Sequence, residues 1–132
     1  MANPNIVNVT SIVGGNLGWN LGTGLTDTLM TVSGSDVIVK VNRITVANVD
    51  GSAAADVSVF VDGLGTAAAD GVTPTAADAT VYLAKTISVP ADATLVLSDT
   101  PIYMMEGDIL KGGASAASDL DLFISYEVLD DA

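Results

Sequence analysis

The feature of this sequence that most limits its fold is a strict alternation of apolar and polar residues near its end. Every second residue from Leu120 to Val128 is apolar, and the residues between them are polar apart from Phe123. Because side chains of a β-strand point alternately to opposite faces, this pattern predicts a strand with one buried and one exposed face. Phe123 falls on the exposed side, where it is either covered by a neighbouring element or open to a partner.

Shorter runs of β-branched and aliphatic residues recur along the chain, each bounded by Gly, Pro, Asn or Asp. They predict strands at residues 6–13, 28–32, 37–46, 57–61, 80–89, 94–97 and 102–105, with 108–110 as a further short one. The apolar pattern changes phase near Asn42 and Arg43, which predicts a β-bulge. Asp50 and Gly51 predict a turn, and we expect a hairpin between the strands on either side of it.

These elements predict an all-β protein, an antiparallel β-sandwich of the jelly-roll type with eight or nine short strands. No window shows a sustained helical stripe with caps, and the Ala clusters are short and flanked by Gly, so they predict loops. We expect a β-sandwich domain at residues 26–132, preceded by an extended N-terminal segment at 1–25. The low-complexity stretch 63–78 predicts a protruding loop.

The N-terminal segment combines a β-prone run at residues 6–13 with a Gly-rich stretch at 14–24, which we expect to be irregular. Two interpretations are open. The segment is an assembly arm that adds a strand to a neighbouring subunit, or it is the first strand of the protein's own sheet. The candidate interface residues are Ile6, Val7, Val9, Ile12, Trp19 and Phe123.

The charge is strongly one-sided, with 16 acidic residues against four basic ones and a formal net charge of −12. Such a surface repels phosphate backbones and anionic lipid surfaces, so no direct nucleic-acid or membrane partner is expected. The charge either keeps the protein soluble or attracts a basic partner surface. The first residues lack a basic segment followed by an apolar one, so synthesis in a cytosol is expected.

Side chains for chemistry are scarce, because the chain contains neither histidine nor cysteine. We therefore expect no catalytic residues, no cofactor and no metal. Acidic pairs such as Asp119 and Asp121 share one face of a strand, which solvated charges explain. Calcium ligation near Asn48, Asp50 and Asp56, or at 130–131, is chemically allowed, but turn formation is the favoured role of these residues.

Three segments carry a resemblance to a known class of protein: VNRITVANVDGSAAADVSVFVDG, YLAKTISVPADATLVLSD and PIYMMEGDILKGGASAASDLDLFISYEVL. Together they span residues 41–129, and the sequence resembles small virion structural proteins of tailed bacteriophages, including phages of marine cyanobacteria. The resemblance implies a β-rich particle component without catalytic residues. It does not extend to the first forty residues.

The function that this resemblance favours is a non-enzymatic capsid decoration, or cement, protein on the outer surface of a phage head. The major capsid protein is then the expected partner, the virion the expected location, and self-association, for instance as a homotrimer, the expected state. One alternative is a neck, tail, baseplate or fibre component of the particle. The other is a carbohydrate- or host-surface-binding module, which normally presents several aromatic side chains on one face.

Overall fold

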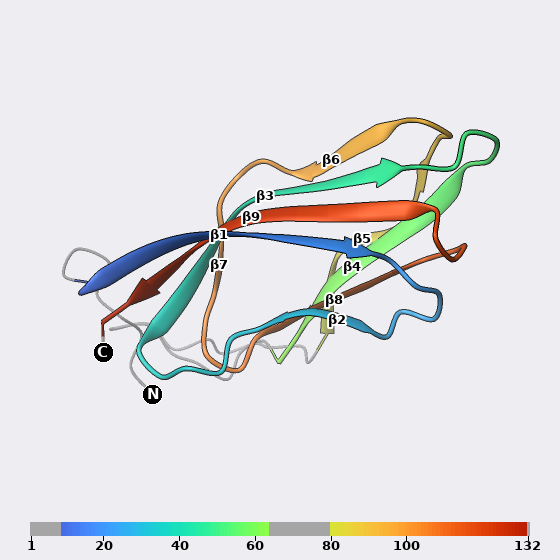
Figure 1. Ribbon diagram of the computed structural model, residues 1–132. Helices are drawn as coiled ribbons and strands as arrows, with labels where there is room; N and C mark the ends of the chain where they lie inside the picture. The colour runs from blue at the N-terminus through green and yellow to red at the C-terminus, as the bar shows by residue number, and fades with distance from the viewer. Residues whose placement is uncertain (1–8, 64–79, 132) are drawn as a thin grey trace.

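The computed structural model describes residues 9–63 and 80–131, and this part of the chain forms nine strands and no helix (Figure 1). The strands are β1 (Ser11–Asn20), β2 (Asp27–Thr31), β3 (Val37–Asn48), β4 (Ala55–Asp62), β5 (Thr80–Val89), β6 (Thr94–Ser98), β7 (Ile102–Met104), β8 (Ile109–Ala114) and β9 (Leu120–Asp130). The prediction of an all-β protein is confirmed.

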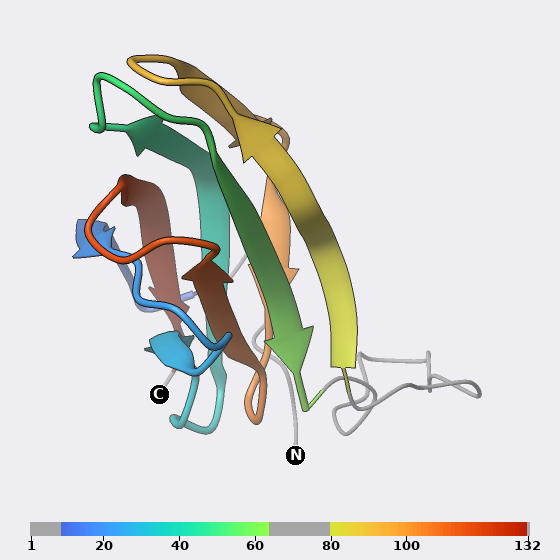
Figure 2. The same ribbon diagram turned by 90° about the vertical axis from the view of Figure 1, so that its right-hand side faces the viewer.

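The strands form two antiparallel sheets that face each other as two layers (Figure 2). One sheet has the order β1-β9-β3-β6, with β7 also paired to β3, and the other has the order β2-β8-β4-β5. If the short β7 is set aside and the remaining eight strands are renumbered along the chain, β8 becomes the seventh strand and β9 the eighth. The two sheets then have the orders 1-8-3-6 and 2-7-4-5. This is the connectivity of a jelly roll, so the predicted sandwich is confirmed.

The core fills the space between the sheets with small aliphatic side chains. The inward residues Leu122 and Ile124 of β9 are fully buried, with exposed fractions of 1% and 0%. From the other sheet, β4 contributes Val57 and Val59, which are also fully buried. The alternating pattern at the end of the sequence therefore identifies the correct buried face.

The predicted bulge in the 37–46 strand is confirmed, because the register of β3 against β9 shifts between Val41 and Arg43. The β3 residues in the core between the sheets have odd numbers before the shift, as in Val39, and even numbers after it, as in Ile44. The extra residue keeps both halves of a long strand facing the core.

The hairpin expected around Asp50 and Gly51 is wrong, because β3 and β4 belong to different sheets. The connection crosses from one layer to the other, and Asn48 holds it in place. The Asn48 side-chain amide donates hydrogen bonds of 2.9 Å to the carbonyl oxygens of Ala53 and Val89. Its Oδ1 accepts one of 2.9 Å from the Asp50 amide, so this buried polar side chain is satisfied.

The N-terminal strand differs from the prediction in its position. The strand lies at Ser11–Asn20, so most of the Gly-rich stretch expected to be irregular is extended, and it pairs with β9 of the protein's own sheet. Residues 6–8 of the expected strand at 6–13, and residues 64–78 of the expected loop at 63–78, lie outside the described residues. Nearer the C-terminus, β8 extends to Ala114, the first residue of an Ala cluster predicted to be a loop.

A tight turn joins β7 and β8, with Gly107 at a φ of 94°. The turn is closed by Asp108, whose Oδ2 accepts a hydrogen bond of 2.9 Å from the Met105 amide. Asp108 is buried, and this burial raises the pKa of its carboxyl group, although the hydrogen bond from Met105 acts in the opposite direction.

We expect Leu122→Asp or Ile124→Asp to unfold the protein, at a cost above about 4 kcal/mol, because each places an unpaired charge in the core. The matched control is Phe123→Asp on the same strand, which places the same group on the exposed face. Circular dichroism and urea titration check both. A native-like Leu122→Asp protein would show that the assigned face is inverted.

The buried Asp108 predicts a pH dependence of stability. The folded protein holds the Asp108 proton more tightly than the unfolded chain, so this group lowers stability as the pH rises through and above its ordinary pKa of 3.8. Asn keeps the acceptor for the Met105 amide without the charge. Asp108→Asn should therefore raise the free energy of unfolding at pH 7, and the gain should vanish below the ordinary carboxyl pKa. Urea titrations at pH 7 and at a pH below 3.8 measure the difference in unfolding free energy. A gain that persists at the lower pH would show that it does not come from the Asp108 charge.

Candidate interface

The structure brings three of the six predicted interface residues to one margin of the larger sheet. Ile12 and Trp19 lie on β1, with 58% and 51% of their surface exposed, and Phe123 lies on the neighbouring β9 with 48% exposed. Val9 precedes β1 and is partly buried. Ile6 and Val7 lie outside the described residues.

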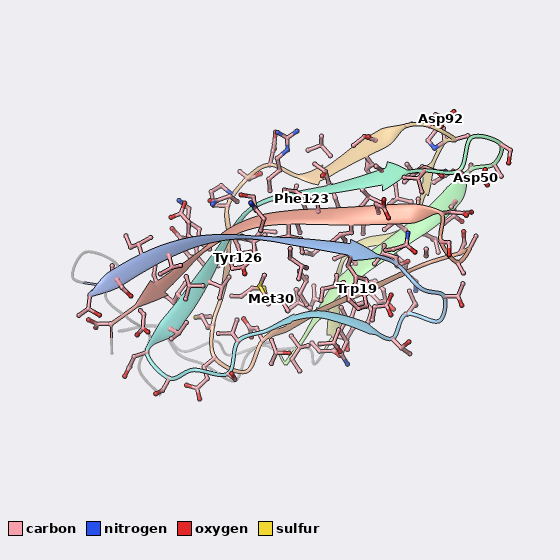
Figure 3. The ribbon with its side chains drawn as sticks, in the orientation of Figure 1. Trp19, Met30, Asp50, Asp92, Phe123 and Tyr126 are labelled. Carbon is pink, nitrogen blue, oxygen red and sulfur yellow. The ribbon has the colours of Figure 1, made fainter. Side chains whose placement is uncertain are left out.

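Trp19 and Phe123, the two aromatic residues among the predicted interface residues, point to opposite faces of the sheet. Trp19 pairs with the buried Leu122, so it lies on the side of the other sheet, whereas Phe123 pairs with Gly18 on the outer side. Figure 3 shows Phe123 above β9 and Trp19 below β1. Trp19 is half exposed because β1 forms the margin of its sheet. The two rings therefore do not form the shared aromatic platform that a carbohydrate-binding module would present.

The outer face of the larger sheet carries an uncharged row that crosses β1, β9, β3 and β6 at one level. Gly18, Phe123, Thr45 and Val96 are successive partners in the registers of β1, β9, β3 and β6. Val96 is exposed, like Phe123. We call these four residues the outer row. The sequence alone could not have identified its members on β3 and β6, because their alignment depends on the registers of three strand pairs.

A shallow depression adjoins the outer row on the side of Asn20. Its lining includes Gly18, Asn20, Asp121 and Phe123. The Asn20 side-chain amide donates a hydrogen bond of 2.7 Å to Oδ1 of Asp121, which ties β1 to β9 at this point. The resulting surface is uncharged along the outer row and polar along one border, and it is open rather than enclosed.

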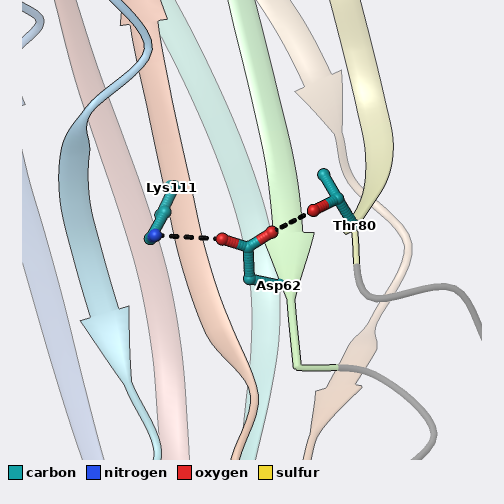
Figure 4. A network of polar contacts seen from close by, with 3 residues as sticks. All are labelled: Asp62, Thr80 and Lys111. Carbon is teal, nitrogen blue, oxygen red and sulfur yellow. Dashed lines mark hydrogen bonds and ion pairs between the residues drawn. The ribbon is translucent and has the colours of Figure 1, made fainter.

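A second polar network lies on the smaller sheet and joins three of its strands (Figure 4). Asp62 of β4 forms an ion pair of 2.9 Å with Lys111 of β8 and accepts a hydrogen bond from the Thr80 hydroxyl of β5. The Thr80 bond and then Lys111 lower the pKa of Asp62. Both partners tie neighbouring strands together, so this network has a structural role.

Among the acidic residues considered for calcium, Asp50 serves a turn in the structure. Asp50 Oδ1 accepts hydrogen bonds from the amide and the hydroxyl of Ser52, at 2.9 and 2.7 Å, and these bonds lower the pKa of Asp50. Within residues 9–63 and 80–131, no three acidic side chains come together as a metal site. In the same part of the chain, no helix has the length and hydropathy to cross a membrane.

The β1 strand is regular along its whole length. Its ten residues pair with β9 in one unbroken register from Ser11 to Asn20. Gly15 allows β1 and the Tyr126 side chain of β9 to approach closely, because the Tyr126 ring covers Gly15. A Cβ atom at this position would lie only 2.6 Å from Cζ of Tyr126. Gly14, on the outer face, has no atom within 4 Å of such a position.

Comparison with known proteins gives no match. No family model fits the sequence, and no similarity was found to a curated protein or to a solved structure.

The contrast between Gly14 and Gly15 predicts different effects of the same substitution. Gly15→Val should destabilise the protein by about 1–3 kcal/mol, because the Tyr126 ring must leave its place over β1. Gly14→Val should be neutral or slightly stabilising, since valine suits an exposed strand better than glycine. Urea unfolding midpoints of the two variants test this. Equal midpoints would show that the Tyr126 contact does not hold β1.

Proposed function

We propose that this protein is a non-enzymatic structural component of a tailed-phage particle that decorates the outer surface of the head, with the major capsid protein as its partner. The observation that carries the proposal is the outer row, in which Phe123 stands half exposed between Gly18 and Thr45. The small neighbours leave the Phe123 ring free to insert into a partner surface.

The shape of this face favours a protein partner. Small-molecule sites are concave and bury most of their ligand, whereas protein interfaces combine an apolar centre with a polar rim. The outer row supplies the apolar centre, and the neighbouring pair Asn20 and Asp121 supplies part of a rim. Aromatic residues, Phe among them, are enriched at protein interfaces, and a few buried residues carry most of the binding energy.

The fold and the sequence resemblance support the same proposal by analogy. Jelly rolls are common in viral capsid proteins, although lectins and cupins share the architecture, so the fold alone does not select a function. The sequence resemblance to virion structural proteins favours the capsid use over the other two. The net charge of −12 adds that a basic patch on the partner would strengthen binding and speed association.

A neck, tail, baseplate or fibre position is the alternative within the same particle, and the copy number separates the two. Quantitative mass spectrometry of purified particles measures the ratio of this chain to the major capsid protein. A decoration protein should approach the abundance of the capsid protein. A few copies per particle would contradict decoration and favour the alternative, and absence from the particles would contradict both.

Phe123 should dominate binding to the head. We expect Phe123→Ser to reduce the affinity for undecorated heads by at least about tenfold, because truncation of a central aromatic residue at an interface typically costs more than 1.4 kcal/mol. The control is Tyr103→Ser, since Tyr103 is equally exposed at 48% but lies on β7, away from the outer row. Co-sedimentation with heads measures both. Unchanged binding of Phe123→Ser would exclude the outer row as the docking surface.

A further inference from the structure

We propose that the open edge of β1 pairs with β1 of a second copy of this chain, so that two larger sheets join into one continuous antiparallel sheet. This inference concerns self-association and does not depend on the proposed function. It rests on a comparison of the four strands that end the two sheets.

Three of these end strands have features that discourage pairing with another chain. On β5 the register against β4 shifts twice, Thr86 has a φ of 49°, and Lys85 adds a charge. β2 and β6 are only five residues long and each has a register shift. Short length, bulges and charges are the usual protections of sheet edges.

The β1 strand has none of these protections. It is ten residues long, its register is unbroken, and its sequence SIVGGNLGWN contains neither a charge nor a proline. Val13 and Trp19 are 59% and 51% exposed on it. No described strand pairs with its outer side. A long, regular and apolar edge of this kind is a template for strand addition.

The backbone groups that face the open edge follow from the ladder with β9. The Leu21 amide donates to the Leu120 carbonyl at 2.9 Å, which identifies a hydrogen-bonded pair at the end of β1. Bonded pairs alternate along an antiparallel ladder, so the odd-numbered residues of β1 bond to β9. The N–H and C=O groups of Ile12, Gly14, Asn16, Gly18 and Asn20 consequently point to the open edge.

A two-fold axis through Asn16 gives the register that best matches the exposed side chains. In this register Val13 lies opposite Trp19 of the partner subunit, and the symmetry repeats the contact. Aromatic and β-branched pairs across antiparallel strands are stabilising. On the outer face the two Asn16 side chains meet, and Gly14 lies opposite Gly18 of the partner subunit, which leaves no steric conflict.

Charge favours β1 as the edge through which two copies meet. Two chains of net charge −12 repel each other wherever their acidic strands meet, and β1 is the longest uncharged strand of the described residues. In the paired sheet the two β9 strands lie three strand spacings apart, about 14 Å. This exceeds the screening length of about 8 Å at physiological ionic strength. A cyclic trimer would instead need β1 to pair with one of the protected edges.

Sedimentation velocity of the full chain tests the pairing. The wild-type protein should form a dimer, and Asn16→Lys should abolish it, because two lysines would meet at the axis. Val96→Lys is the matched control, with the same charge on the exposed face of β6 at the far end of the sheet, and it should leave the dimer intact. A monomeric wild type, or a dimer that survives Asn16→Lys, would overturn the proposal.

A single cysteine tests the register independently, because the natural chain contains none. Bonded antiparallel pairs place their Cα atoms about 5.5 Å apart, within the range of a disulfide. Asn16→Cys should therefore form a covalent dimer under mild oxidation, whereas Val96→Cys should not. Equal cross-linking of the two variants would contradict the register. Dimers that form only after residues 1–8 are deleted would show that the chain's own start occupies the edge, which would also overturn the proposal.

Discussion

The burial of one face of β9 is the constraint on which the rest of the structure depends. β9 lies between β1 and β3, and its inward residues Leu122 and Ile124 are sealed beneath the second sheet. A register slip of one residue would turn these side chains to solvent and bring Phe123 into the core. The same constraint therefore sets the position of Phe123 on the outer face and the level at which β1 and β3 align beside it.

Patterns within single strands could be predicted from the sequence, whereas relations between strands could not. The buried face of β9 and the bulge after Val41 are local features that alternation encodes. The predicted strand at 6–13 ends too early, because the glycines of β1 suggest an irregular segment. In the structure all ten residues of β1 pair with β9, and the Tyr126 ring covers Gly15. Likewise, the opposite orientation of Trp19 and Phe123 depends on a register between segments a hundred residues apart, which no local pattern contains.

The strongly acidic composition has mostly local consequences inside the fold. Asp62 is held by Lys111 and Thr80, Asp121 by Asn20, and Asp50 by Ser52, so each of these three carboxylates has a partner on a neighbouring strand or in its own turn. Exposed pairs of this type contribute little stability, which leaves the apolar core as the main source. The wider effect of the charge is on association, because it limits the surfaces through which two copies can approach.

Dimerisation through β1 and docking through the outer row can occur together. Strand pairing uses the edge of the larger sheet, whereas docking uses its outer face. Joining two copies along β1 would place both Phe123 side chains on the same outer face of one continuous sheet, since a two-fold axis normal to the sheet preserves the face. A dimer would then present two docking sites in a fixed orientation. Simultaneous binding to repeated subunits of a shell raises the effective affinity well above that of one site. A weak contact centred on a single phenylalanine would thus suffice for stable decoration.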